Sequence, residues 1–153
     1  MQDFKQLKVW QKSHSLVLRI YAATVVFREH ERFGITSQMR RAAASVPANI
    51  AEGCARASRV EFCQFLHVAA GSASELEYFL LLARDLRLFT DKQHGALYAS
   101  RYEIRRMLTG LIQQVDPRRV TSNVIMAKSA SSQAIHPLPP VQSALTKNLE
   151  LKT

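Results

Sequence analysis

Cys63 and His67 are the side chains that come nearest to forming a metal site in this sequence. Their spacing of four residues places a thiol and an imidazole on one face of a helix, where they could supply two ligands to a zinc ion. No CxxC motif and no second Cys/His pair completes the tetrahedral set that such an ion requires. We therefore expect no metal and no cofactor, and we interpret the pair as a buried thiol beside a hydrogen-bonded histidine.

Three carboxylates, Glu52, Glu75 and Glu77, lie within apolar or small-residue stretches. A buried pair of carboxylates could perform general acid and base catalysis. However, the sequence holds no Glu-x-x-His pair, phosphate-binding glycine loop, Gly-x-Ser-x-Gly elbow or His-Glu-x-x-His helix to accompany them. We favour a structural role, in which Arg40 and Arg41 of a neighbouring helix pair with these carboxylates. The prediction is that the protein is not an enzyme and has no catalytic residues.

Positive charge is the most prominent chemical property of the chain. It has 21 Lys and Arg against 12 Asp and Glu, a net charge of +9, and an isoelectric point near 10.1. This balance favours RNA or DNA as a partner, and the alternative is a basic surface that only keeps the helices in solution. Cations that share a helix face or flank a loop are the predicted nucleic-acid-binding residues: Lys5, Lys8, Lys12, Arg56, Arg59, Arg101, Arg105 and Arg106.

Long helices must position these residues, because helix breakers are sparse. Only one of the five prolines, Pro47, precedes residue 117. Apolar spacings of three and four residues predict helices over residues 6–28, 34–55, 58–83 and 90–115. Pro47 predicts either a kink or two half-helices in the second of these. Short connections and the lack of any period-two segment predict an all-α fold, an antiparallel up-down-up-down four-helix bundle over residues 1–116.

Each predicted helix has one stripe that we assign to the core. The first stripe is Leu7, Trp10, His14, Val17, Tyr21 and Val25, and the second is Met39, Ala42, Ala43, Val46 and Ile50. The third is Phe62, Phe65, Leu66, Ala69, Ala73, Leu76, Leu80 and Ala83, and the fourth is Leu97, Ile104, Leu108, Leu111 and Val115.

Residues 117–153 differ in composition from the rest of the chain. They contain four of the five prolines and carry five basic residues against one acidic residue. With little apolar surface to bury, they are predicted to form a flexible, disordered basic tail. No stretch approaches the roughly 18–20 apolar residues of a membrane helix, and the N-terminus lacks the layout of a signal peptide. We expect a soluble cytoplasmic protein with no membrane partner.

Five segments of the sequence carry a family resemblance. They are Phe4-x-x-Leu-Lys-Val-Trp-Gln-Lys12, Ser37-Gln-Met-Arg-Arg-Ala42, Ser45-Val-Pro-Ala-Asn-Ile-Ala-Glu-Gly53, Glu61-Phe-x-x-Phe-Leu66 and Gly71-Ser-Ala-Ser-Glu-Leu76. Together they closely resemble the bacterial four-helix-bundle family encoded within intervening sequences of large-subunit ribosomal RNA genes. The resemblance covers about residues 3–116.

The resemblance implies an up-down bundle that assembles as a ring-like homopentamer. It also implies a relationship to the accessory variability determinant of diversity-generating retroelements, a basic pentameric barrel that binds nucleic acid and a reverse transcriptase. A closed ring uses head-to-tail contacts, so each subunit must bury surface on two sides. Apolar residues outside the predicted core stripes are the interface candidates: Val9, Leu16, Leu18, Ile20, Tyr78, Phe79, Leu81 and Leu82.

Two functions follow from these features. The first is a non-enzymatic, oligomeric nucleic-acid-binding accessory protein that assists a reverse transcriptase or a structured RNA. The alternative is a protein-interaction adaptor or scaffold with no nucleic-acid role. In the adaptor, the ring faces or the tail segment Pro137-Leu-Pro-Pro140 would recruit a protein partner.

Overall fold

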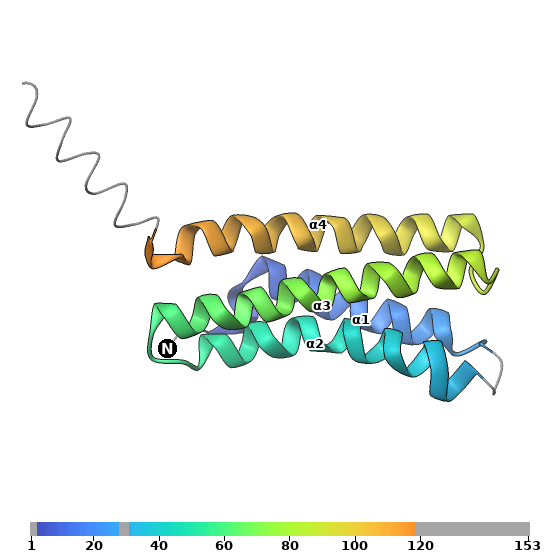
Figure 1. Cartoon of the computed structure of the whole chain (residues 1–153), viewed down its shortest axis with the longest axis horizontal. Helices are drawn as coiled ribbons and strands as arrows, with labels where there is room; N and C mark the ends of the chain where they lie inside the picture. Colours follow the sequence, from blue (N-terminus) through green and yellow to red (C-terminus); the bar gives the residue numbers. More distant parts are fainter. Residues whose placement is uncertain (1–2, 28–30, 119–153) are drawn as a thin grey trace, which may run out of the picture. The chain divides into compact units, whose positions relative to one another are not determined.

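The structure is a computed structural model that describes residues 3–27 and 31–118. All regular structure in these ranges is helical: η1 (Phe4–Gln6), α1 (Lys8–Thr24), η3 (Arg32–Thr36), α2 (Ser37–Cys54), α3 (Arg59–Asp85) and α4 (Asp91–Val115). This confirms an all-helical fold with four main helices (Figure 1). None of the helices in these ranges is long and apolar enough to cross a membrane. The predicted tail lies outside the described residues, apart from Pro117 and Arg118.

The four helices lie side by side, and the colour order in Figure 1 shows that successive helices run in opposite directions. α2 packs against α1 and α3, while α4 packs against α3 and α1. Residues 55–58 connect α2 to α3, and residues 86–90 connect α3 to α4. Connections this short bring helices that are consecutive in sequence next to each other in space.

Side chains at the starts of α3 and α4 satisfy backbone groups that a helix leaves without partners. Ser58 Oγ accepts a hydrogen bond of 3.1 Å from the Glu61 backbone N–H. At α4, Gln93 N–H donates to Thr90 Oγ1 at 3.2 Å, and Thr90 N–H donates back to Gln93 Oε1 at 3.0 Å. These caps confirm the two helix starts that were predicted from the sequence.

α2 runs without interruption from Ser37 to Cys54, with Pro47 buried inside it. The chain therefore does not divide into two half-helices at this proline, and a kink there stays a prediction. Pro47 has no N–H to donate to the carbonyl of Ala43, one turn earlier.

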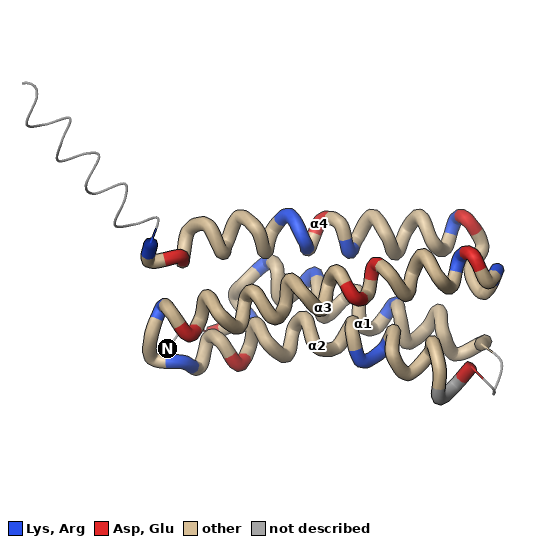
Figure 2. Tube along the Cα trace, in the orientation of Figure 1, with Lys and Arg blue, Asp and Glu red and all other residues tan. Residues whose placement is uncertain are grey.

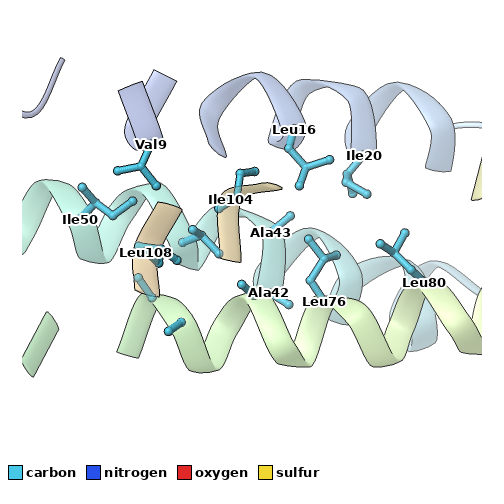
Figure 3. Packing of buried hydrophobic residues seen from close by; sticks show 14 of the residues in the cluster. Val9, Leu16, Ile20, Ala42, Ala43, Ile50, Leu76, Leu80, Ile104 and Leu108 are labelled. Carbon is cyan, nitrogen blue, oxygen red and sulfur yellow. The ribbon is translucent and has the colours of Figure 1, made fainter. Parts of the chain in front are cut away.

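The hydrophobic core runs along the inside of all four helices (Figure 3). The predicted stripe of α2 is buried throughout, and α3 is buried from Leu66 to Ala83 at the predicted positions. Phe62 and Phe65 at the start of α3 and Leu111 of α4 are only partly buried. The largest fully buried apolar side chains are Ile20, Met39, Ile50, Leu66, Leu76, Leu80, Ile104 and Leu108.

α1 turns a different face to the core from the one predicted. Its buried residues are Val9, Ser13, Leu16, Ile20 and Thr24. Tyr21 and Val25 of the predicted stripe are 47% and 73% exposed. Three interface candidates, Val9, Leu16 and Ile20, are therefore core residues, which corrects their assignment to a subunit contact.

The hydroxyl groups of two residues explain why the apolar pattern did not predict this core face of α1. Ser13 and Thr24 interrupt the apolar pattern of the true core stripe, yet both are satisfied inside it. Ser13 Oγ donates to the carbonyl of Trp10, and Thr24 Oγ1 donates to the carbonyl of Ile20, each at 2.8 Å. Because these bonds stay within α1, the polar groups are buried at little cost.

Candidate nucleic-acid interface

One edge of α1 is basic and adjoins α4. Lys12 Nζ lies 3.0 Å from the carboxylate of Glu103. Arg19 Nη1 donates a hydrogen bond of 2.6 Å to Ser100 Oγ. These two contacts show that Lys12 and Arg19 lie on the surface that α1 and α4 share.

Lys8 and Arg106 extend this surface toward the N-terminal end of α1. Lys8 lies one turn before Lys12 on α1, and Arg106 lies one turn after Glu103 on α4. Because the two helices run in opposite directions, both steps lead to the same end of the bundle. Both side chains are exposed, and neither forms an ion pair within the described residues. We call Lys8, Lys12, Arg19 and Arg106 the α1–α4 basic face.

Lys5 does not continue the α1 face that was predicted for it. It belongs to the short turn η1, ahead of α1, and is exposed. Its Nζ lies 6.0 Å from the centre of the Phe4 ring. That ring packs edge-on against Trp10, with ring centres 4.9 Å apart. Lys5 is therefore a nearby cation that belongs to a different local surface.

Arg101 is buried, which corrects its assignment to an exposed basic face. Only 3% of the residue is exposed, and its guanidinium pairs with Glu77 of α3. Burial lowers the pKa of Arg101, and the charge of Arg105 lowers it further. The sequence indicates this burial, because Arg101 follows Leu97 by four residues and precedes Ile104 by three, which places it on the core face of α4. A guanidinium held in this position cannot reach a phosphate group at the surface.

Arg105 and Arg106 point to different sides of α4, because consecutive helix residues are about 100° apart. Arg105 lies one turn after Arg101 and is half-buried, and its Nη1 donates to Thr109 Oγ1 at 3.0 Å. Arg106 is exposed. The two arginines therefore do not act as one pair.

Arg56 and Arg59 flank the connection between α2 and α3. Arg56 pairs with Glu52 and lies 4.8 Å from the centre of the Phe65 ring. Arg59 Nη2 donates to the backbone carbonyl of Gln114 in α4 at 3.0 Å. Both arginines line a pocket of about 140 Å³ at this connection. They stay candidates for anion binding, although each already has a partner within the chain.

The three carboxylates within apolar stretches all contact arginine. Glu75 accepts from Arg41 Nη2 at 3.0 Å, which confirms one of the two arginines predicted for this role. Glu52 and Glu77 instead pair with Arg56 and Arg101.

Arg40, the other predicted partner, joins α2 to α1. Its Nε donates to Thr24 Oγ1 at 2.9 Å, and its guanidinium lies over the Tyr21 ring at 4.7 Å.

The Cys63 and His67 pair is split between the interior and the surface. Cys63 is buried, whereas His67 is exposed. Burial raises the pKa of the Cys63 thiol and that of the other buried thiol, Cys54. Among the residues that the structure describes, no group of three His, Cys, Asp or Glu side chains could hold a metal ion.

The comparisons with known proteins agree with the helical fold. Residues 5–110 match the family described as 23S rRNA-intervening sequence protein. The chain belongs to this family. It is also similar to the crystal structure of a protein with unknown function from the S23 ribosomal protein family of Bacteroides thetaiotaomicron. The two chains share 29% identity over 69% of this chain and 95% of that chain, with a TM-score of 0.64. No curated protein matches the sequence.

In this member of the 23S rRNA-intervening sequence family, three residues of the α1 stripe that was predicted as core, Trp10, His14 and Val17, line a groove between α1 and α2. We call it the α1–α2 groove, and its volume is about 330 Å³. Its lining contains no Lys, Arg, Asp or Glu side chain: Phe4, Trp10, His14, Val17, Ala44, Pro47, Ala48 and Ala51. Trp10 and His14 stack with their rings nearly parallel and 5.2 Å apart.

A second uncharged surface follows the outside of α3. No Lys, Arg, Asp or Glu occurs between Glu61 and Glu75, and Figure 2 shows this stretch in tan. We define the α3 outer stripe as the exposed residues of this stretch: Gln64, His67, Val68, Gly71 and Ser74. A Cβ added at Gly71 would meet nothing within 4 Å, so no contact inside the subunit requires glycine there. Such a long uncharged surface is unusual for a chain with a net charge of +9.

Proposed function

We propose that this chain is a non-enzymatic, oligomeric protein that binds structured RNA through the α1–α4 basic face. The observation that carries the proposal is that Lys8 and Arg106 are exposed and have no acidic partner within the described residues. Helical periodicity places each of them one turn from the contact between Lys12 and Glu103. Lys12 and Arg19 continue the same surface. The family's description refers to 23S rRNA, so structured RNA is the first ligand to test and duplex DNA is its competitor.

Phosphate neutralisation is the physical basis of this binding. Each cation that contacts a phosphate releases condensed counterions, which makes the affinity fall as salt rises. The three cations of this face without an acidic partner within the described residues, Lys8, Arg19 and Arg106, would give a slope of about −3 in log K against log salt on one duplex, at about −0.9 per phosphate. Copies of the face in an oligomer would raise the overall affinity through multivalency.

Assembly into a homo-oligomer is the second part of the proposal. The α1–α2 groove and the α3 outer stripe are different uncharged surfaces, as head-to-tail assembly requires. Depletion of charge is typical of the centre of a protein interface. Neither surface includes the α1–α4 basic face, so assembly would repeat that face around the oligomer. The resemblance to pentameric relatives makes five the expected number of subunits.

An accessory role is the third part. Glu52, Glu75 and Glu77 are engaged by arginines, which supports a structural role for these carboxylates and not acid or base catalysis. The protein would act by holding RNA, beside a reverse transcriptase or within an RNA-containing complex.

The deciding experiment is a fluorescence-anisotropy titration of structured RNA and duplex DNA across a salt series. It compares the wild type with Lys8→Glu/Arg106→Glu and with Arg87→Glu/Lys92→Glu, a control with the same change in net charge. Arg87 and Lys92 are exposed near the connection between α3 and α4. Losing two phosphate contacts should reduce the salt slope by about two. The control should keep the wild-type slope, and an equal loss in both variants would contradict a localised face.

A protein adaptor is the competing function, and the α1–α2 groove is the observation that favours it. An amphipathic helix of a partner could bury its apolar side against Trp10, Val17 and Ala48. If RNA and DNA bind weakly and the Lys8/Arg106 variant changes nothing, the groove becomes the candidate functional surface. Binding of a partner should then fail in Ala48→Glu and persist in Lys8→Glu/Arg106→Glu.

A further inference from the structure

A polar cleft of about 150 Å³ lies between α1 and α4, within the α1–α4 basic face. Its lining combines two cations, two hydroxyl groups and one carboxylate over an apolar floor: Lys12, Arg19, Ser15, Ser100, Glu103, Leu16 and Ile104. The two floor residues are buried in the core, at 4% and 2% exposure. The floor therefore belongs to the core, whereas Lys12, Ser15, Arg19 and Glu103 are exposed.

Arg19 is oriented in this cleft but not neutralised. Its Nη1 donates to Ser100 Oγ at 2.6 Å, and Ser100 Oγ donates in turn to the carbonyl of Ala96 at 3.0 Å. The single hydroxyl proton of Ser100 is used in the second bond, so Ser100 serves Arg19 as an acceptor. Within the described residues, Arg19 has no carboxylate partner, which leaves most of its five N–H donors available to a ligand.

The charges around the cleft are suited to a ligand that carries a single negative charge. Lys12 is offset by Glu103 at 3.0 Å. The remaining formal charge of the cleft is then that of Arg19, +1. A phosphodiester carries one negative charge and two oxygens that a guanidinium can bind in a bidentate manner. Inorganic phosphate carries more charge near pH 7 and would approach the Glu103 carboxylate less favourably.

We propose that this cleft binds one phosphodiester group of the RNA backbone, with Arg19 as the bidentate ligand and the Ser15 hydroxyl as an additional donor. The inference rests on the proposed function and deepens it. It adds a residue that was not among those predicted from the sequence. Within the α1–α4 basic face, Arg19 lies seven residues beyond Lys12, which is about 10 Å further along α1.

The role of the Arg19 guanidinium is tested by measuring RNA binding of Arg19→Gln and Arg19→Lys as full-length chains. Arg84→Gln, which removes another exposed arginine, is the control. Thermal unfolding checks that each variant is folded. Arg19→Gln should weaken RNA binding about tenfold, as expected for a lost charge-assisted bidentate contact, and should reduce the salt slope by about one. Arg19→Lys should keep the wild-type slope yet lose affinity, because lysine retains the charge without the planar fork. If Arg19 had a purely structural role, Arg19→Gln and Arg19→Lys would not differ in this pattern of RNA affinity and salt slope.

A second measurement keeps the inference independent of RNA binding. The Arg19 Nε–Hε resonance, assigned by its loss in Arg19→Lys, is followed by NMR during titration with dimethyl phosphate, inorganic phosphate or sodium chloride. A saturable shift with dimethyl phosphate that exceeds the shift with inorganic phosphate is the expected result. Larger shifts with inorganic phosphate would overturn the phosphodiester assignment and indicate a site for free phosphate. Shifts no larger than those with chloride would overturn the cleft as an anion site.

The two proposals fail in distinguishable ways. If Lys8→Glu/Arg106→Glu loses RNA while Arg19→Gln behaves like Arg84→Gln, RNA binding stands and the cleft inference is wrong. If wild-type protein binds no RNA but Arg19 responds to dimethyl phosphate, the proposed function fails and the cleft remains a phosphodiester site.

Discussion

Arg101 of α4 and Glu77 of α3 form an ion pair across the inside of the bundle. Tyr98 completes the arrangement, since its hydroxyl donates to Glu77 Oε1 at 2.9 Å and its ring lies 5.1 Å from the guanidinium. Arg101 Nε is buried and has no hydrogen-bond acceptor among the described residues. The charge of Arg101 is therefore compensated mainly by one carboxylate, which makes α3 and α4 depend on each other.

Glu77→Gln should destabilise the subunit by roughly 3 kcal/mol, because it leaves a buried guanidinium without a counter-charge. This value is at the low end for a broken buried pair, since the Glu77 side chain is 33% exposed. Replacing both partners, as Glu77→Leu/Arg101→Met, should restore stability to within about 1 kcal/mol of the wild type. Urea unfolding measures both free energies. If Glu77→Gln unfolds with the wild-type midpoint, the pair contributes nothing.

Gly53→Ala should destabilise the junction of α2 and α3 by about 1–3 kcal/mol through overpacking. Its new Cβ would lie 2.8 Å from Phe62 Cδ2 and 2.9 Å from Phe65 Cβ, and the latter atom is attached directly to the backbone of α3. Gly95→Ala in α4 is the matched control, because its Cβ meets open space outside both uncharged surfaces and alanine favours helix by up to about 1 kcal/mol. Thermal unfolding of the subunit should move in opposite directions for the two variants.

The buried thiols should make stability fall at alkaline pH. Burial raises the pKa of Cys54 and of Cys63, so both thiols stay protonated in the folded state after exposed thiols have ionised. The unfolded state then binds fewer protons, and the free energy of unfolding decreases as pH rises. Below the pH at which exposed thiols ionise, this contribution is constant.

Urea unfolding under reducing conditions at pH 7.5, 8.5 and 9.5 measures this effect. Cys54→Ala/Cys63→Ala should show a shallower fall than the wild type over the same range. Parallel curves would mean that other groups account for the alkaline instability.

Ala48→Glu should dissociate the oligomer by placing a charge in the uncharged α1–α2 groove. Ala48 is exposed on α2, so the change should leave the subunit fold intact. Ala99→Glu, at an exposed position of α4 outside both uncharged surfaces, is the control. Light scattering should report a smaller particle only for Ala48→Glu. A wild type that is already monomeric would contradict the assembly.

Most of the core of α2, α3 and α4 could be predicted because one apolar stripe dominates in each of these helices. Spacings of three and four residues assign Met39, Val46 and Ile50 to the interior of α2, and all three are buried. α1 carries two apolar faces, and periodicity does not distinguish them. The choice depends on whether polar residues such as Ser13 and Thr24 can bond within their own helix, which the structure shows that they do.

The sequence by itself determined where α3 and α4 begin, how side chains are spaced around each helix axis, and which family the segments resemble. Only the tertiary structure decided which side chains meet across helices, such as Lys12 with Glu103 and Arg19 with Ser100. The helical period sets the angle of a residue on its own helix. It does not set the position of the residue opposite, which depends on the register and rotation that packing of the whole core selects.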